Sequence, residues 1–102
     1  MKVAISSLGK DENSKVSDVS GRAPYYLIFE NRKLVKVIPN PFRIGGGGAG
    51  FGVAQMLAQE GVELVVSGRF GENMKSALES KGIKYKELSG MSVREALEEV
   101  SK

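Results

Sequence analysis

The segment 45–67 constrains the fold more than any other part of the chain. It begins with the glycine-rich turn Gly45–Gly50, continues with apolar residues at helical spacing, and reaches Gly61, a typical carboxyl cap of a helix. The apolar run Leu64–Val66 follows, as in a strand that is buried on both faces of a sheet. A helix that leads into such a strand indicates a crossover connection in a sheet covered by helices.

The remaining patterns predict four further strands and two further helices. Strands are expected over 2–7, 25–30, 33–38 and 83–86, and the pair Asn31-Arg32 suits a two-residue hairpin turn. A helix with an apolar face ends at Gly82, and Ser92 and Glu95 form a capping box at the start of the last helix. The order of elements predicts a three-layer α/β fold, in which a mixed five-stranded sheet has helices on both faces.

Two segments in the first third of the chain differ sharply in apolar content. Residues 9–20 have little apolar content and predict a long, exposed loop. Residues 25–29 are aromatic or aliphatic throughout, which predicts a strand covered on both sides.

The amino-acid composition excludes several kinds of active site. The chain contains no cysteine and no histidine, so disulfides, thiolate zinc sites, cysteine nucleophiles, serine-histidine triads and imidazole ligands are excluded. The first strand carries no carboxylate at 3, 5 or 7, which excludes the clustered acids of a two-metal nuclease. We expect no catalytic residues and therefore no enzyme.

Length and charge predict the organisation and surroundings of the protein. A chain of 102 residues forms one domain over 1–102. Basic and acidic residues are interspersed around a net charge of +3, which favours a solvated surface over a nucleic-acid site. No apolar stretch approaches the roughly 20 residues of a membrane span, which predicts a cytoplasmic protein without membrane contact. We expect a monomer or a weak homodimer.

Three segments, 16–30, 40–86 and 90–100, resemble the dinitrogenase iron-molybdenum cofactor biosynthesis family. The motifs that carry the resemblance are Ser-Gly-Arg-Ala at 20–23, Gly-Gly-Ala-Gly at 47–50 and Gly-Arg-Phe-Gly-Glu-Asn at 68–73. The resemblance covers nearly the whole chain. It implies a ribonuclease H-like fold with strand order 3-2-1-4-5 and strand 2 antiparallel. It also implies a small accessory or carrier protein that binds an iron-molybdenum cluster, its precursors or a related metal species, with metallocluster assembly or acceptor proteins as partners.

The chain departs from the family at one informative position. Members often have a His-Phe pair ahead of the Gly-Arg-Ala motif, where this chain has Val19 and Ser20. A histidine that helps to hold a cluster elsewhere in the family has no counterpart here, because the side chain of Val19 offers no lone pair.

The predicted topology brings several loops to one edge of the sheet. Ligands usually lie at the carboxyl ends of the strands, where the loops 6–8, 20–22, 43–50 and 67–73 are expected to converge. Three arginines, Arg22, Arg43 and Arg69, would then lie beside the start of the first helix, where guanidinium groups and free backbone amides favour an anion. The candidate residues for binding an anion or a cluster are Arg22, Gly47, Gly48, Gly50, Arg69 and Asn73.

Each candidate also has a structural explanation. The glycines allow a tight turn and close packing of the first helix on the sheet. Arg22 and Arg69 are explained equally well as surface charges or as partners of Asp18 or Glu72. Asp18, Glu72 and Asn73 could together hold a hard cation, although capping of the second helix explains the last two as well.

Two alternative functions remain open. A phosphate- or nucleotide-binding protein or sensor would use the glycine-rich turn, in which Gly45, Gly47 and Gly50 match a dinucleotide fingerprint. The fingerprint lacks its acidic partner, since Val65 stands about 20 positions further on, and Phe51 stands where a phosphate loop has lysine. The second alternative is a protein-interaction module that uses the loop 9–20.

Overall fold

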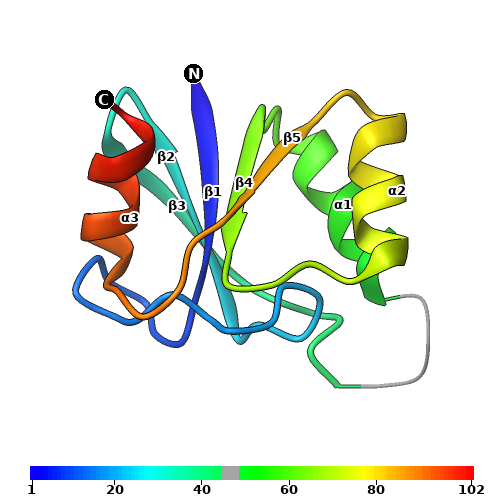
Figure 1. Ribbon diagram of the computed structural model, residues 1–102, viewed down its shortest axis with the longest axis horizontal. Helices are drawn as coiled ribbons and strands as arrows, with labels where there is room; N and C mark the ends of the chain where they lie inside the picture. The colour runs from blue at the N-terminus through cyan, green and yellow to red at the C-terminus, as the bar shows by residue number, and fades with distance from the viewer. Residues whose placement is uncertain (45–48) are drawn as a thin grey trace.

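The computed structural model describes residues 1–44 and 49–102, which form a mixed five-stranded sheet and three helices (Figure 1). The strands lie in the order β3-β2-β1-β4-β5, and β2 is antiparallel to β1, so the predicted topology is confirmed. The elements are β1 (Lys2–Ser7), β2 (Tyr25–Glu30), β3 (Lys33–Pro39), α1 (Ala49–Gln59), β4 (Leu64–Ser67), α2 (Glu72–Ser80), β5 (Lys84–Glu87) and α3 (Val93–Val100).

Helices cover both faces of the sheet, with α1 and α2 on one side and α3 on the other (Figure 1). Successive side chains of a strand point to opposite faces. Tyr26 and Ile28 of β2 therefore pack in the core beneath α1 and α2, whereas Leu27 and Phe29 pack in the core beneath α3. All four side chains are buried, which confirms that this strand is covered on both sides.

The crossover predicted from segment 45–67 is present, because α1 leads into β4 and β4 is parallel to β1. The described part of α1 ends at Gln59, and Gly61 follows with a φ of 78°, a left-handed conformation that glycine adopts without strain. The hairpin between β2 and β3 is also confirmed, since Asn31 and Arg32 both have positive φ, as a two-residue turn between twisted strands requires. In the described part of the chain, no helix has both the length and the apolar character needed to cross a membrane.

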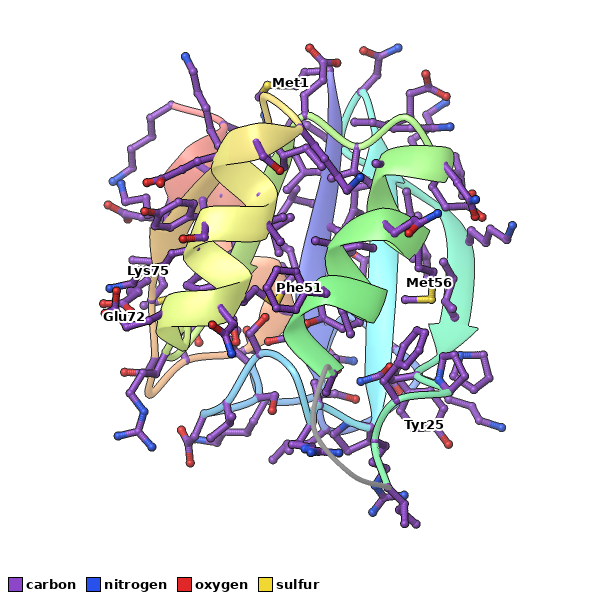
Figure 2. All side chains as sticks on the ribbon, turned by 90° about the vertical axis from the view of Figure 1, so that its right-hand side faces the viewer. Met1, Tyr25, Phe51, Met56, Glu72 and Lys75 are labelled. Atoms are coloured by element: carbon purple, nitrogen blue, oxygen red, sulfur yellow. The ribbon has the colours of Figure 1, made fainter. Side chains whose placement is uncertain are left out.

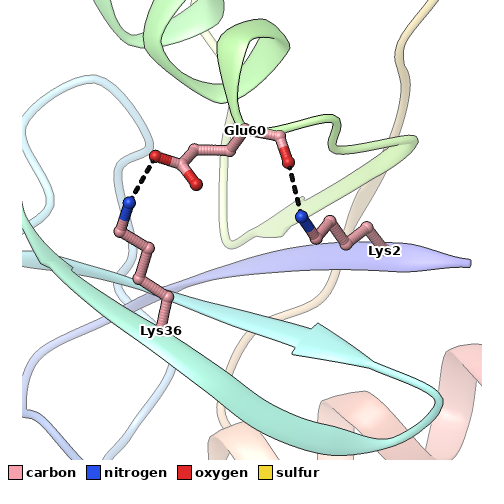
Figure 3. Close-up of polar contacts among 3 residues, drawn as sticks. All are labelled: Lys2, Lys36 and Glu60. Atoms are coloured by element: carbon pink, nitrogen blue, oxygen red, sulfur yellow. Dashed lines mark hydrogen bonds and ion pairs between the residues drawn. The ribbon is translucent and has the colours of Figure 1, made fainter.

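The carboxyl end of α1 is tied to two strands by lysines (Figure 3). Lys2 of β1 donates from Nζ to the backbone carbonyl of Glu60 at 2.9 Å, and Lys36 Nζ of β3 lies 2.7 Å from Glu60 Oε2. Positive charge at this end also suits the helix dipole. Both lysines therefore help to orient α1 on the sheet.

The loop 9–20 is not exposed throughout, and this prediction was wrong for its second half. Val16, Ser17 and Ser20 are buried. The backbone of Val16 donates to Met91 O at 3.0 Å, and that of Ser17 donates to Ser6 O at 3.0 Å. A serine-rich segment can lie in the interior when its backbone and hydroxyl groups find partners there, and composition alone does not show this.

The capping box at α3 is confirmed. Glu95 donates its backbone N–H to the Ser92 hydroxyl at 3.1 Å, and Ser92 donates its backbone N–H to Glu95 Oε1 at 2.9 Å. The backbone hydrogen bond from Ser92 holds the pKa of the Glu95 carboxyl below its usual value of 4.5. The ionised carboxylate is therefore favoured by the folded state.

Acid is expected to weaken the start of α3 through Glu95. A carboxyl group whose pKa is lowered on folding adds stability above its unfolded pKa, and that stability is lost as the pH falls through the folded pKa. We expect Glu95→Gln to flatten the fall of the melting temperature as the pH drops below about 4.5, the usual pKa of a glutamate carboxyl. Glu98→Gln, an exposed change on the same helix, is the control and should keep the parent's pH profile. Identical profiles for the two variants would contradict the assignment.

Candidate functional site

A pocket of about 320 Å³ opens at the end of the sheet where α2 begins. It lies between the turn 19–22, the first residues of the described part of α1 and the amino terminus of α2. Figure 2 shows this side of the molecule, with Glu72 and Lys75 labelled near the beginning of α2. The lining residues are Val19, Gly21, Arg22, Ala49, Gly50, Gly71, Glu72, Asn73 and Met74.

The pocket gathers three of the residues predicted from the sequence and leaves one outside. Arg22, Gly50 and Asn73 line it, but Arg69 is not among the described residues that do. The backbone of Arg69 is nearby, because its carbonyl accepts a hydrogen bond from Ser20 N at 3.0 Å. Gly47 and Gly48 lie outside the described residues. A binding role for all of these residues remains a prediction.

A buried polar contact beside the pocket joins the turn 20–23 to the sheet. The phenol of Tyr26 donates to the carbonyl of Ser20, and its oxygen lies 2.7 Å from the Ser20 hydroxyl. The same hydroxyl is 3.3 Å from the sulfur of Met74. Burial raises the pKa of the Tyr26 phenol, and the hydrogen bond with Ser20 lowers it by less. The phenol therefore stays neutral and holds the turn from below.

Asn40 is a structural determinant of the site that the sequence analysis missed. Its side-chain amide donates to the carbonyls of Gly21 at 3.0 Å and Ala23 at 2.9 Å, and its Oδ1 accepts from Phe42 N at 2.9 Å. Asn40 thus joins the turn 20–23 to the loop 40–44. Its position between two prolines, in Pro-Asn-Pro, was the available signal, because asparagine beside proline favours a turn built on side-chain hydrogen bonds.

The guanidinium group of Arg22 is anchored to the same loop. Arg22 Nη1 donates to the carbonyl of Phe42 at 3.1 Å. The side chain remains exposed at the pocket wall, and a guanidinium group is the side chain best suited to bidentate binding of an anion. The loop held by Asn40 therefore orients Arg22, the one cationic side chain among the described residues that line the pocket.

Gly50 has a steric role in the contact between α1 and α2. A Cβ atom at this position would lie 3.0 Å from Met74 N and 3.1 Å from Met74 Cβ. The expected close packing of α1 is present, but at Gly50 it is made with the start of α2 and not with the sheet. This contact brings the two helices together at the pocket.

The amino terminus of α2 is open to the pocket. Its N-cap residue is Gly71, and no side chain makes a capping hydrogen bond there, so capping does not account for Glu72 or Asn73. Glu72 is exposed, and its Oε1 lies 3.7 Å from Lys75 Nζ. The backbone amides at the start of the helix, together with Arg22, favour negatively charged ligands. Nowhere in 1–44 or 49–102 do three aspartate, glutamate, histidine or cysteine side chains gather as a metal site would need, and a cation site made by Asp18, Glu72 and the amide of Asn73 stays a prediction.

The crevice between β1 and β4 is filled by the chain itself, which corrects the expectation that the loop 6–8 helps to form the mouth. The hydroxyl of Ser6 donates to Ser67 Oγ at 2.7 Å, and Ser67 Oγ donates to the carbonyl of Ser17 at 3.3 Å. Gly68 N donates to the same carbonyl at 2.9 Å. Ser17 therefore occupies the edge where ligands of parallel sheets usually lie, and the pocket is displaced towards α1 and α2.

Comparison with known proteins identifies relatives of the whole chain. The family described as dinitrogenase iron-molybdenum cofactor matches residues 1–102. None of the curated proteins matches. The apo form of the orange protein from Desulfovibrio gigas has a TM-score of 0.92 at 26% identity, over 98% of this chain and 86% of that chain. A putative NifB protein from Thermotoga has a TM-score of 0.85 at 36% identity with the same coverage. A putative dinitrogenase from Methanocaldococcus jannaschii, 19% identical over 95% of this chain and 84% of that chain, shares the fold with a TM-score of 0.64.

Proposed function

Since the chain belongs to the dinitrogenase iron-molybdenum cofactor family, we propose that it is a small, non-catalytic carrier of an iron-molybdenum cluster or its anionic precursor. The observation that carries the proposal is the pocket in which Arg22 lies beside the open amino terminus of α2. Metallocluster assembly or acceptor proteins would be its partners.

The side chains available as metal ligands and hydrogen-bond donors decide how such a cargo would be held. Without cysteine or histidine, the chain offers no thiolate or imidazole to iron. Arg22 and the amides at the start of α2 instead suit a complete anion that brings its own metal ligands. Val19 lines the pocket and stands where members of the family often have histidine. At this position the chain therefore offers the cargo an apolar side chain. The site therefore fits a molybdenum oxyanion or thioanion, or a cluster that is already fully ligated.

The lining supports holding rather than catalysis. Among the described residues of the pocket, the ionisable side chains are Arg22 and Glu72, and Glu72 is paired with Lys75. A nucleophile next to a base, which covalent catalysis needs, is not formed by the described lining.

Removing the guanidinium group is expected to weaken cargo binding. We expect molybdate and tetrathiomolybdate to shift the backbone amide signals of Gly21, Gly50 and Asn73 in ¹⁵N-labelled protein. Arg22→Ala should lower the affinity about tenfold or more, because charge-assisted hydrogen bonds contribute about 1.5–3 kcal/mol. The measurement is a nuclear magnetic resonance titration of parent and variant.

Two further variants and two further ligands make this titration decisive. Arg94→Ala removes the same charge from α3 on the other face, where Arg94 pairs with Glu12, and should bind as the parent does. Arg69→Ala tests separately the binding role predicted for Arg69. Inorganic phosphate and ADP serve as competing anions, and tighter binding of either one would favour the phosphate-ligand alternative. The absence of any shift with all four ligands would exclude the carrier proposal.

A further inference from the structure

Three exposed apolar side chains belong to segments that line the pocket or contact its lining residues. Ile44 is 85% exposed, Phe51 52% and Val19 39%. We call these three residues the docking rim. They come from the loop 40–44, the first turn of α1 and the turn 19–22, which Figure 1 shows at the same end of the sheet. Val19 lines the pocket itself, and Phe51 lies between α1 and α2 in Figure 2.

The structure holds the segments of the docking rim close to one another. A Cβ atom at Gly52 would lie 2.4 Å from Phe42 Cε1, so the ring of Phe42 packs directly on the first turns of α1. Phe42 also accepts the hydrogen bond from Arg22, which joins the loop 40–44 to the turn that carries Val19. The spacing of the rim is therefore set by packing and hydrogen bonds among described residues.

Core packing does not explain the docking rim. The face of α1 that packs on the sheet presents Val53, Ala54 and Leu57, all of them buried. Single exposed apolar residues are ordinary, but several on neighbouring segments at one end of the sheet are typical of a surface that another molecule covers.

The charge around the docking rim indicates the chemistry of that molecule. Arg22, Arg43 and Arg69 are all exposed at this end, and neither Arg43 nor Arg69 makes an ion pair with any residue in the described part of the chain. The nearby acids are Asp18, Glu72 and Glu87. Glu72 is paired with Lys75, and the carboxylate of Glu87 accepts a hydrogen bond from Phe70 N at 3.1 Å. The surface therefore combines exposed apolar side chains with a border that is basic on balance, and its complement has apolar side chains with an acidic border.

Two other occupants fit less well. A second copy of the chain in a symmetric contact would bring the same arginines together, and like charges repel. A lipid surface is bound by a helix whose apolar face is free, whereas the apolar face of α1 is buried on the sheet.

We propose that the docking rim is the contact surface for a partner protein that presents apolar side chains bordered by aspartate and glutamate. The partner would cover the pocket while cargo passes between the two proteins, which removes water from the ionic contacts of the cargo. This inference rests on the proposed function for its account of the cargo. The arginines would speed the encounter at low salt, since complementary charges steer association.

The test uses a defined probe, a synthetic amphipathic helical peptide with leucine and phenylalanine on one face and glutamate on the other. We expect it to shift the amide signals of Val19, Ile44 and Phe51 in ¹⁵N-labelled protein. The same peptide with lysine in place of glutamate should bind at least about tenfold more weakly, and added salt should weaken binding of the glutamate peptide.

Matched variants separate the docking rim from surface hydrophobicity in general. Phe51→Ser and Ile44→Ser should each weaken binding of the glutamate peptide. Val35→Ser should leave that binding unchanged, although Val35 of β3 is 52% exposed like Phe51. Equal binding of both peptides, or shifts mapping away from the rim, would overturn the inference. Binding to phosphatidylserine vesicles that needs Phe51, without peptide binding, would also overturn it.

Molybdate distinguishes failure of this inference from failure of the proposed function. Phe51→Ser should bind molybdate as the parent does, because Phe51 is not among the described residues that line the pocket. If the parent binds molybdate and not the glutamate peptide, the inference fails and the carrier function stands. If the parent binds the glutamate peptide at the rim and not molybdate, the carrier function fails, and with it the role of the partner in cargo transfer.

Discussion

Replacing Gly68 by alanine is expected to lower the free energy of unfolding by about 1–3 kcal/mol, the usual effect of overpacking. The added methyl group would lie 2.8 Å from both the Cα and the carbonyl oxygen of Asp18. These are backbone atoms, so no side-chain rotation relieves the contact. The hydrogen bond from Gly68 N to Ser17 O, at 2.9 Å, would have to lengthen as the segment 16–20 moves away. Urea unfolding followed by circular dichroism measures the loss.

Gly71→Ala is the matched control for this substitution. A Cβ atom there meets no atom within 4 Å, and the φ of −73° is accessible to alanine. We expect its stability to stay within about 1 kcal/mol of the parent, since the loss comes only from alanine being a poorer N-cap than glycine. Gly68→Ala should in addition shift the amide signals of the turn 19–22, since Ser20 N bonds to Arg69 O next to the substituted residue. Equal stability of the two variants would contradict the steric role of Gly68.

Leu57→Ala is expected to have the largest effect on stability, about 2–5 kcal/mol. Leu57 is fully buried, and it belongs to the core that α1 and α2 form over the sheet. Small domains are stable by about 5–15 kcal/mol in total, so this loss is a large fraction of the free energy of unfolding. With each kcal/mol shifting the melting temperature of a domain of this size by about 4–8 °C, a fall of at least about 8 °C is expected in a thermal scan.

Leu8→Ala provides the comparison, because it removes the same atoms from a side chain that is exposed. Its free energy of unfolding should change by less than about 0.5 kcal/mol. Leu57→Ala should also weaken molybdate binding at temperatures where the protein is folded, since α1 supplies one wall of the pocket. A loss from Leu8→Ala as large as that from Leu57→Ala would show that the core is placed wrongly.

The elements of the fold could be predicted from the sequence because local patterns determine them. The spacing of apolar residues located α1 and α2, and the Ser92 and Glu95 pair located the start of α3 within one residue. The unbroken apolar run 25–29 correctly placed β2 inside the sheet. Residues 9–20 were misjudged because hydroxyl groups give no sign of whether water or another buried serine will be their partner.

The candidate site was predicted only in part. The order of strands and helices brought Arg22, Gly50 and Asn73 together correctly, since loops at one edge of a sheet must be neighbours. The same reasoning also placed Arg69 and the loop 6–8 at the mouth of the site. Side-chain direction and the path of the segment 15–20 decide both points, and neither follows from strand order.

The sequence by itself determined the helices, the strands, their order and the kinds of chemistry that the protein lacks, because hydrophobic period, capping residues and composition are properties of the chain. Only the tertiary structure decided the shape of the pocket. Ser17 fills the crevice and Asn40 joins two loops, both through contacts between residues far apart in the chain, and the buried phenol of Tyr26 holds the turn at Ser20. Such contacts depend on where the backbone passes in three dimensions, which no local pattern of residues specifies.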